Sequence, residues 1–153
     1  MRLLRTNQED TRFQELVKQL DAELAIRDGK DHAFYHQFNG IALLDHVVLF
    51  LKNDIAVGCG AFKVRTHDQI EIKRMYVLPS YRKKGIAKKL LIDLEKWGAE
   101  LGYREAVLET GKAQTEALSF YPKMKYNIMP NFPPYEGIKN SVCFKKDLSL
   151  DPF

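Results

Sequence analysis

The chain has 153 residues, of which 45% are apolar and 29% are charged, as in an ordinary compact globular domain. A net charge of +4 favours an anionic ligand, and no apolar run approaches the length needed to span a bilayer. The polar N-terminus lacks a signal-peptide core, and the two cysteines, Cys59 and Cys143, lie in apolar strand-like runs. We therefore expect one cytoplasmic domain over residues 1–153 with buried free thiols, rather than a membrane protein or a secreted disulfide scaffold.

The first third of the chain changes from a strand pattern to a helix pattern. Arg2 to Arg5 is expected to form a short strand, and Thr6 to Glu9 has the spacing of a capping box. The helical stripe that follows consists of Phe13, Leu16, Val17, Leu20 and Leu24. A second helical piece is expected over His32 to Phe38, with Asn39 and Gly40 ending it.

A hairpin and then a strand–helix unit occupy the middle of the chain. Val47 to Leu51 is expected to pair with Ile55 to Val64 through a turn at Lys52, Asn53 and Asp54. The next strand runs from Gln69 to Val77 and is stopped by Pro79, because proline donates nothing to a sheet. From Ala87 a helical stripe continues until Gly102; its members are Leu90, Leu91, Leu94, Trp97 and Leu101.

The last third holds three shorter elements. Ala106 to Glu109 is expected to be a strand, Gln114 to about Tyr121 a helix, and Ser141 to Lys145 a final strand. Pro122 is expected to end the helix immediately after Tyr121. Helices that alternate with strands, after an antiparallel hairpin, indicate a mixed sheet with helices on its faces.

A basic turn, Arg82-Lys83-Lys84-Gly85-Ile86-Ala87, connects the strand to the long helix. A helix N-terminus presents unpaired N–H groups and the positive end of the helix dipole, and Gly85 lets the backbone approach a ligand closely. The turn is therefore a candidate site for a phosphate or pyrophosphate group. The alternative is that these cations only form a solvated face.

Two segments resemble the GNAT superfamily of N-acetyltransferases. Arg82-x-x-Gly85-x-Ala87, after a strand ending Met75-Tyr76-Val77, is similar to the acetyl-coenzyme A loop of the family. The segment from Gln114 to Tyr121 is similar to a second family segment, with Gln114 where asparagine is usual and Lys125 where a later glycine is usual. The order of the expected elements also matches the family over nearly the whole chain.

The resemblance implies a fold and a cosubstrate. The fold is a single-domain α/β (α+β) GNAT fold, whose mixed, mostly antiparallel twisted sheet has about six to seven strands, is flanked by about four helices and is splayed between the fourth and fifth strands. The cosubstrate is acetyl-coenzyme A, whose pantetheine lies along the fourth strand as an added strand would, with its pyrophosphate on the basic turn. The cofactor-binding residues so implied are Met75, Tyr76, Val77, Arg82, Lys83, Lys84, Gly85, Ile86, Ala87, Lys88, Gln114 and Tyr121.

The resemblance also implies catalytic roles in an acyltransferase reaction. Glu71 falls at the family's strand glutamate, which acts as a base on the amine directly or through water, and Tyr121 falls at the position of the acid for the leaving thiolate. Backbone N–H groups from Met75 to Val77 would stabilise the oxyanion. The alternatives are a solvent-facing Glu71, paired with Lys73 or Arg74, and a Tyr121 that only packs between helix and sheet.

The acceptor is expected to be a small-molecule amine in a partly aromatic pocket between His32–Phe38 and the loop Asn131–Gly137. That loop can equally be a rigid hairpin connection. No metal is expected, since His32 and His36 lack the context of a metal motif. The rival functions are a non-catalytic coenzyme A-binding protein and a basic nucleic-acid-binding module, although no nucleic-acid-binding motif accompanies the cations. The oligomeric state, monomer or homodimer, is left open.

Overall fold

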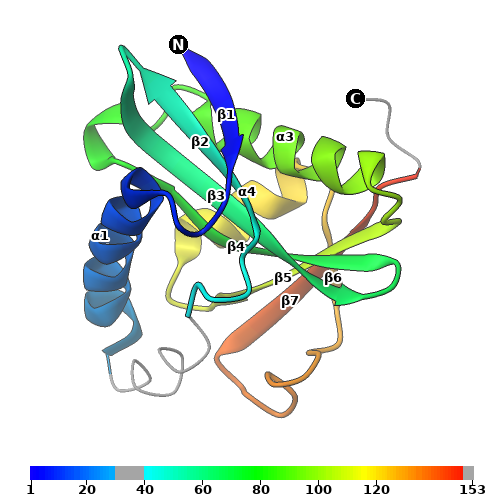
Figure 1. The fold of residues 1–153 in the computed structure, drawn as a ribbon. Helices are drawn as coiled ribbons and strands as arrows, with labels where there is room; N and C mark the ends of the chain where they lie inside the picture. Colours follow the sequence, from blue (N-terminus) through cyan, green and yellow to red (C-terminus); the bar gives the residue numbers. More distant parts are fainter. Residues whose placement is uncertain (30–39, 150–153) are drawn as a thin grey trace.

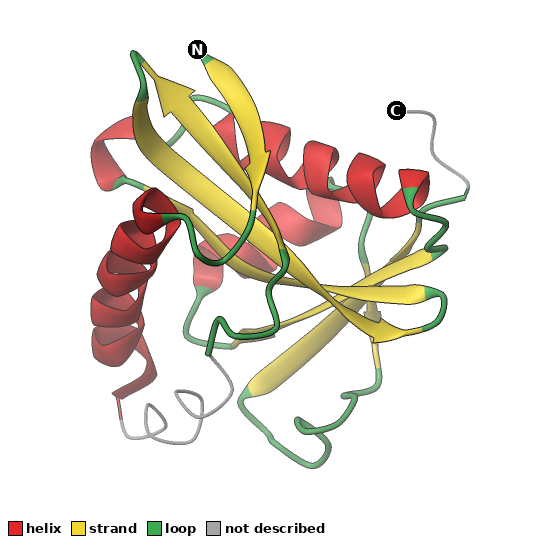
Figure 2. Cartoon of the chain, in the orientation of Figure 1, coloured by secondary structure: helices red, strands yellow, loops and turns green. Residues whose placement is uncertain are grey.

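A computed structural model describes residues 1–29 and 40–149 and shows a twisted seven-stranded sheet with helices on both faces (Figures 1 and 2). The elements are β1 (Arg2–Thr6), α1 (Thr11–Asp28), β2 (His46–Lys52), β3 (Ile55–Thr66), β4 (Gln69–Val77), the 3-10 turn η2 (Pro79–Tyr81), α3 (Ile86–Glu100), β5 (Glu105–Gly111), α4 (Thr115–Lys123), β6 (Asn127–Met129) and β7 (Ser141–Asp147). The α/β architecture is confirmed. The described residues contain three α-helices, against about four expected, and His32–Phe38 lies outside them.

The strand order is β1-β2-β3-β4-β5-β7-β6, and every neighbouring pair is antiparallel except β4 and β5. The expected hairpin turn joins β2 to β3, where Asn53 and Asp54 have φ angles of 51° and 64°. Positive φ at both central residues is the geometry of a two-residue hairpin turn whose twist matches the strands. Asparagine and aspartate tolerate this region better than other non-glycine residues.

The parallel pairing of β4 with β5 is short. It runs from Gln69 opposite Glu105 to Glu71 opposite Val107, and no further register pairs join the two strands. Both strands continue beyond this point, β4 to Val77 and β5 to Gly111. The sheet is therefore splayed between its fourth and fifth strands, as expected.

A β-bulge interrupts β4 just after the splay begins. Tyr76 lies opposite Cys59 and Lys73 opposite Ala61, so Arg74 and Met75 together face the single position of Gly60. Arg74 takes a positive φ of 59° there. One extra residue reverses the alternation of side chains along a strand. Lys73 and Tyr76 consequently point to the same face of the sheet.

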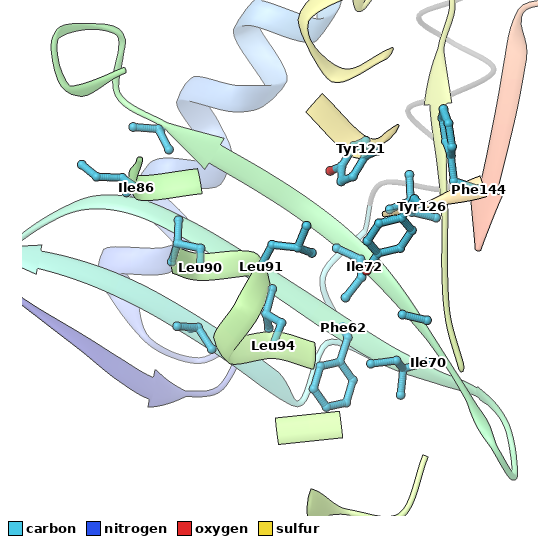
Figure 3. Close-up of a cluster of buried hydrophobic side chains, with 14 of the residues drawn as sticks. Phe62, Ile70, Ile72, Ile86, Leu90, Leu91, Leu94, Tyr121, Tyr126 and Phe144 are labelled. Carbon is cyan, nitrogen blue, oxygen red and sulfur yellow. The ribbon is translucent and has the colours of Figure 1, made fainter. Parts of the chain in front are cut away.

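Two apolar cores cover the two faces. Behind α3 and α4, the buried cluster in Figure 3 includes Phe62, Ile70, Ile72, Ile86, Leu90, Leu91, Leu94, Tyr121, Tyr126 and Phe144. The other face packs against α1, whose predicted stripe of Phe13, Leu16, Val17, Leu20 and Leu24 is buried throughout. Figure 1 shows α1 on one side of the sheet and α3 with α4 on the other. Periodicity alone identified the buried stripe of α1 and most of the stripe of α3. Leu101, the last expected member of the second stripe, instead follows the end of α3 and is 50% exposed.

Three local expectations need correction. Thr6 belongs to β1, so the N-cap of α1 is Asp10, whose side chain accepts a hydrogen bond from the Arg12 N–H at 2.9 Å. Helix α4 passes through Pro122 and ends at Lys123, because a proline in the last turn costs one hydrogen bond but does not force the chain out of the helix. The short strand β6 was not expected.

The expectation for the two cysteines is confirmed. Cys59 and Cys143 are free and buried. Lys125, which stands where the family has glycine, has a φ of 71°, the conformation that glycine adopts most easily. Among the described residues, no helix has both the length and the apolar character required to cross a membrane.

A buried polar network joins α3 to β7. Glu95 is 1% exposed and accepts two hydrogen bonds, from the Tyr126 hydroxyl at 2.7 Å and from Lys146 Nζ at 2.9 Å. Lys146 is itself 8% exposed. A buried carboxylate is tolerated only when such partners replace its water.

We predict that Glu95→Ala lowers the free energy of unfolding by about 3 kcal/mol, because it leaves the Lys146 ammonium buried beside an apolar side chain. Urea denaturation followed by circular dichroism measures the change. Lys96→Ala, at the next and exposed position of the same helix, should change stability by less than about 0.5 kcal/mol. Equal effects of the two substitutions would contradict the role given to the network.

Candidate functional site

Three adjoining cavities meet where β4 and β5 separate. We call them the long groove, the central chamber and the outer pocket; their volumes are about 470, 140 and 290 Å³. The groove and the chamber share Leu20, Leu24, Met75, Gln114, Ala117 and Tyr121. The chamber and the outer pocket share Glu71, Lys73 and Tyr135. The shared walls make one passage, bounded by α1, α4 and the two diverging strands.

The long groove runs past the second half of β4 to the N-terminus of α3. Its lining includes Met75, Tyr76 and Val77 together with Arg82, Lys83, Gly85, Ile86, Ala87 and Lys88. Gly85 caps α3 with a φ of 80°, and no side chain caps this helix. The first-turn N–H groups therefore have no intrahelical acceptor and face a site suited to an anion.

The cations of the basic turn do not all point the same way. Lys83, Lys84 and Lys88 are exposed. The Arg82 guanidinium instead donates from Nε to the Val77 carbonyl at 2.8 Å and makes two 3.1 Å hydrogen bonds to the Glu23 carboxylate of α1. Arg82 thus holds the turn against β4 and α1 at the wall of the groove.

Tyr121 and Gln114 stand where the groove meets the central chamber. The Tyr121 ring packs 5.6 Å from Tyr126 and 6.0 Å from Phe144, and Figure 3 shows its hydroxyl on the side away from Phe144. Burial raises the pKa of Tyr121, so its phenol is protonated at neutral pH. Both expected roles for this residue are compatible with its position, because it packs in the core and also lines the cavities.

Glu71 faces the central chamber from β4 and is 4% exposed, so it is not a solvent-facing strand residue. Its carboxylate forms ion pairs with Lys63 at 3.7 Å and Lys73 at 3.9 Å. Arg74, the other expected partner, turns away at the bulge and pairs with Asp21 of α1. Glu71 therefore stands between two ammonium groups on the wall shared with the outer pocket.

A second carboxylate in the chamber, Glu109 of β5, was missed from the sequence. Glu71 is in register with Val107, which puts Glu109 two residues farther along on the same face of the sheet. Ser141 Oγ donates to Glu109 Oε2 at 2.7 Å, and burial raises the pKa of Glu109 to about 7. The available signal was a carboxylate directly after the apolar run from Ala106 to Leu108 in an expected strand.

The chamber is polar for so small and enclosed a space. Arg74 Nε and Thr110 Oγ1 both line it, are buried, and have no hydrogen-bond partner among the described residues. Buried polar atoms are nearly always paired with protein, water or ligand. The chamber is therefore suited to hold polar groups rather than to serve as an apolar packing defect.

The outer pocket opens on the α1 side of the sheet, next to Leu43, Leu44 and the loop Asn131–Gly137. From this loop, Tyr135 lines the pocket, whereas Phe132 packs with Val107 and Cys143 under the Arg65 guanidinium, 4.4 Å from its ring. Pro134 of the same loop also lines the outer pocket, and Tyr135 is the one of these two aromatic residues that faces it. Within residues 1–29 and 40–149, no three His, Cys, Asp or Glu side chains are grouped to hold a metal ion.

The chain is similar to known acetyltransferases. The profile of the family described as "Acetyltransferase (GNAT) family" matches residues 9–126. An IAA acetyltransferase of Azospirillum brasilense is 32% identical over 98 residues, 63% of this chain and 64% of that protein. An aminoglycoside N(6')-acetyltransferase type 1 of Salmonella typhimurium is 29% identical over 85 residues, 52% of this chain and 55% of that protein. The chain thus spans less than two thirds of the length of these relatives.

One solved structure covers nearly the whole chain. A candidate acyl-CoA N-acyltransferase from Klebsiella pneumoniae aligns with a TM-score of 0.80 and 26% identity, over 96% of this chain and 97% of that one.

We predict that Glu109→Gln stabilises the protein more at pH 8 than at pH 5, by about 2 kcal/mol. Burial raises the pKa of Glu109, so between these pH values the folded state retains a proton that the unfolded state has released, and the wild type loses stability as pH rises. Urea unfolding of both proteins at each pH measures the difference. An equal gain at both pH values for Glu109→Gln would contradict the prediction.

Proposed function

Because the chain belongs to the acetyltransferase (GNAT) family, we propose that it transfers the acetyl group of acetyl-coenzyme A to a primary amine of a small molecule. The observation that carries the proposal is the central chamber. The chamber connects the long groove, which ends at the N-terminus of α3, to the outer pocket. Tyr121 lies on the wall that the chamber shares with the groove, and Glu71 lies on the wall that it shares with the pocket. Two substrates can reach each other there from opposite directions.

In the proposed complex, the long groove binds the cosubstrate. The pyrophosphate accepts hydrogen bonds from the N–H groups at the start of α3, and Lys83, Lys84 and Lys88 supply positive field. Pantetheine lies along Met75 to Val77, the part of β4 that has no register pairs with β5. The thioester then reaches the chamber beside Tyr121 and Gln114.

The proposed reaction is a direct attack. The neutral amine forms a bond to the thioester carbonyl carbon, and the negative charge on the carbonyl oxygen is stabilised by backbone N–H groups between Met75 and Val77. The amine proton passes to Glu71 or Glu109, directly or through water. When the carbon–sulfur bond breaks, the Tyr121 hydroxyl donates its proton to the thiolate, which leaves as coenzyme A.

Glu109 can share the role of base that the family resemblance implies for Glu71. The best base at neutral pH has a pKa near the working pH, and burial raises the pKa of Glu109 to about 7. The Glu71 carboxylate already forms ion pairs with Lys63 and Lys73. We propose that the two carboxylates form one proton-accepting unit.

We predict that Gly85→Asp weakens the binding of acetyl-coenzyme A at least ~100-fold, about 3 kcal/mol by affinity arithmetic. The new carboxylate would stand against the pyrophosphate at the N-terminus of α3. Titration calorimetry measures the affinity directly.

The matched control for this substitution is Gly102→Asp, at the other end of α3. Like Gly85, Gly102 has a positive φ, of 95°, and a Cβ added to it would meet open space. The two substitutions therefore introduce similar backbone strain and the same added charge. The control should keep the wild-type affinity. A folded Gly85→Asp protein with wild-type affinity would show that the turn is not the pyrophosphate site.

We predict that Glu71→Gln and Glu109→Gln each lower kcat at least ~10-fold with little change in the affinity for acetyl-coenzyme A, because each removes a proton acceptor. The loss should shrink as pH rises and more of the amine is neutral. Tyr121→Phe should also lower kcat, by slowing thiolate departure. Thiol release in the presence of an accepted amine measures all three.

Tyr103→Phe, in the same apolar cluster but outside the chamber, is the control for Tyr121→Phe and should keep the wild-type rate. Full turnover by all three variants on a verified acceptor would show that other groups carry the protons. Saturable binding of acetyl-coenzyme A without turnover of any amine would instead favour the non-catalytic alternative. Salt-sensitive binding of duplex DNA without coenzyme binding would favour the nucleic-acid alternative.

A further inference from the structure

The balance of charge differs between the central chamber and the outer pocket. The chamber lining contains three carboxylates, those of Asp28, Glu71 and Glu109, and two cations, Lys73 and Arg74, of which Arg74 is paired with Asp21 of α1. Asp28 and Glu109 line the central chamber but not the outer pocket. Lys63 lines the outer pocket but not the chamber, while Glu71 and Lys73 stand on the wall between them. An amine in the chamber therefore meets carboxylates, and a group that extends outward from it meets lysines.

The outer pocket carries a positive excess among its described lining residues. Two lysines, Lys63 and Lys73, are balanced there by one carboxylate, that of Glu71. The sheet fixes this arrangement, because Lys63 is in register with Glu71 and Lys73 with Ala61 on neighbouring strands. The distance of 3.7 Å between Lys63 Nζ and the Glu71 carboxylate is that of an ion pair longer than a hydrogen bond, so Glu71 offsets part of the positive charge of the pocket.

The environment of Lys73 also favours an incoming anion. Its side chain is 9% exposed, and burial lowers the pKa of the ammonium while Glu71 and Glu109 oppose the shift. An anion bound beside a poorly solvated ammonium restores the charged form and is attracted more strongly than it would be in water.

From this polarity we propose that the acceptor carries a carboxylate as well as an amine, and that the outer pocket binds the carboxylate through Lys63 and Lys73. The acceptor class is then amino acids and similar zwitterions, with the amine directed into the central chamber. This inference rests on the proposed acetyl transfer to a small amine and names the substrate class of that site.

Charge balance distinguishes this class from two others. The net charge of +1 among the described lining residues of the pocket matches one carboxylate, whereas a dianionic phosphate would leave charge uncompensated. A polycationic amine, such as the aminoglycosides named for the Salmonella typhimurium relative, would place additional ammonium groups against Lys63 and Lys73. Like charges at that range repel, and such repulsion is a common source of specificity.

The experiment measures acceptor binding and turnover for the standard amino acids and for their carboxamides, which keep the amine but lose the carboxylate. Thiol release from acetyl-coenzyme A gives kcat and KM, and titration calorimetry in the presence of coenzyme A gives the affinity of each acceptor. Aminoglycosides and simple diamines are tested in parallel. We expect at least one amino acid to have a KM at least ~10-fold below that of its carboxamide, with the polycationic amines weaker still.

Substitution then identifies the residues responsible. Lys63→Met keeps the length of the side chain at a half-buried site and removes its charge; it should raise KM for the amino acid ~10-fold or more and leave KM for the carboxamide within about twofold. Lys63→Arg, which retains the charge, should restore most of the affinity. Lys18→Met, at an exposed position of α1, should change neither value.

The two proposals fail in different ways. Carboxylate-dependent binding that Lys63→Met abolishes, without thiol release from any amine, would support the substrate class and overturn the proposed acetyl transfer. Turnover of carboxamides or polycationic amines with a KM equal to or below that of the amino acids would overturn the substrate class and leave the transfer intact. An equal effect of Lys63→Met on the amino acid and on its carboxamide would also overturn the substrate class.

Discussion

The site depends on the short pairing between β4 and β5, which run in parallel over only three register pairs. A longer ladder would satisfy more backbone groups, but it would also close the space that becomes the central chamber. The splay leaves the second half of β4 available to pair with something other than β5. It also lets side chains from the two faces of the sheet, Tyr121 from the α4 side and Glu109 from the α1 side, line the same cavity.

The bulge at Arg74 and Met75 gives the splayed strand its two functions. Before the bulge, Glu71 and Lys73 point toward the α1 face, away from the apolar cluster of Ile70 and Ile72. After it, Met75 and Val77 line the long groove. A regular strand could not present Lys73 and Tyr76 on one face, because an odd separation places side chains on opposite faces. The extra residue therefore lets one strand serve two cavities.

The charged side chains buried in the chamber lower the free energy of unfolding, and other parts of the fold offset this loss. Glu71, Glu109 and Lys73 occupy a part of the sheet that could have been an apolar core, and burial raises the pKa of Glu109 and lowers that of Lys73. The apolar clusters on the two faces of the sheet and the hydrogen bond between Lys146 and Glu95 do not include these three residues, and they contribute stability apart from the chamber. Buried ionisable groups with shifted pKa values, next to a stable apolar core, are characteristic of functional sites.

Local patterns predicted the parts of the fold that depend on local physics. Three features follow from periodicity and turn chemistry and are present: the stripes of α1 and α3, except for the exposed Leu101, the hairpin at Asn53 and Asp54, and the strand–turn–helix around Gly85. The partner of Arg82 is Glu23, 59 residues away, and no local pattern reports such a contact. Glu109 was missed for the same reason, since its surroundings come from β4, β7 and α1. The β6 strand is three residues long, too short for a periodic signal.

The most direct test of this account is a crystal structure of the protein with coenzyme A. We expect the pyrophosphate on the N–H groups at the start of α3, pantetheine along Met75 to Val77, and the thiol in the central chamber within reach of Tyr121. Coenzyme A bound elsewhere on the surface, or in the groove with its thiol directed away from the gap between β4 and β5, would contradict it.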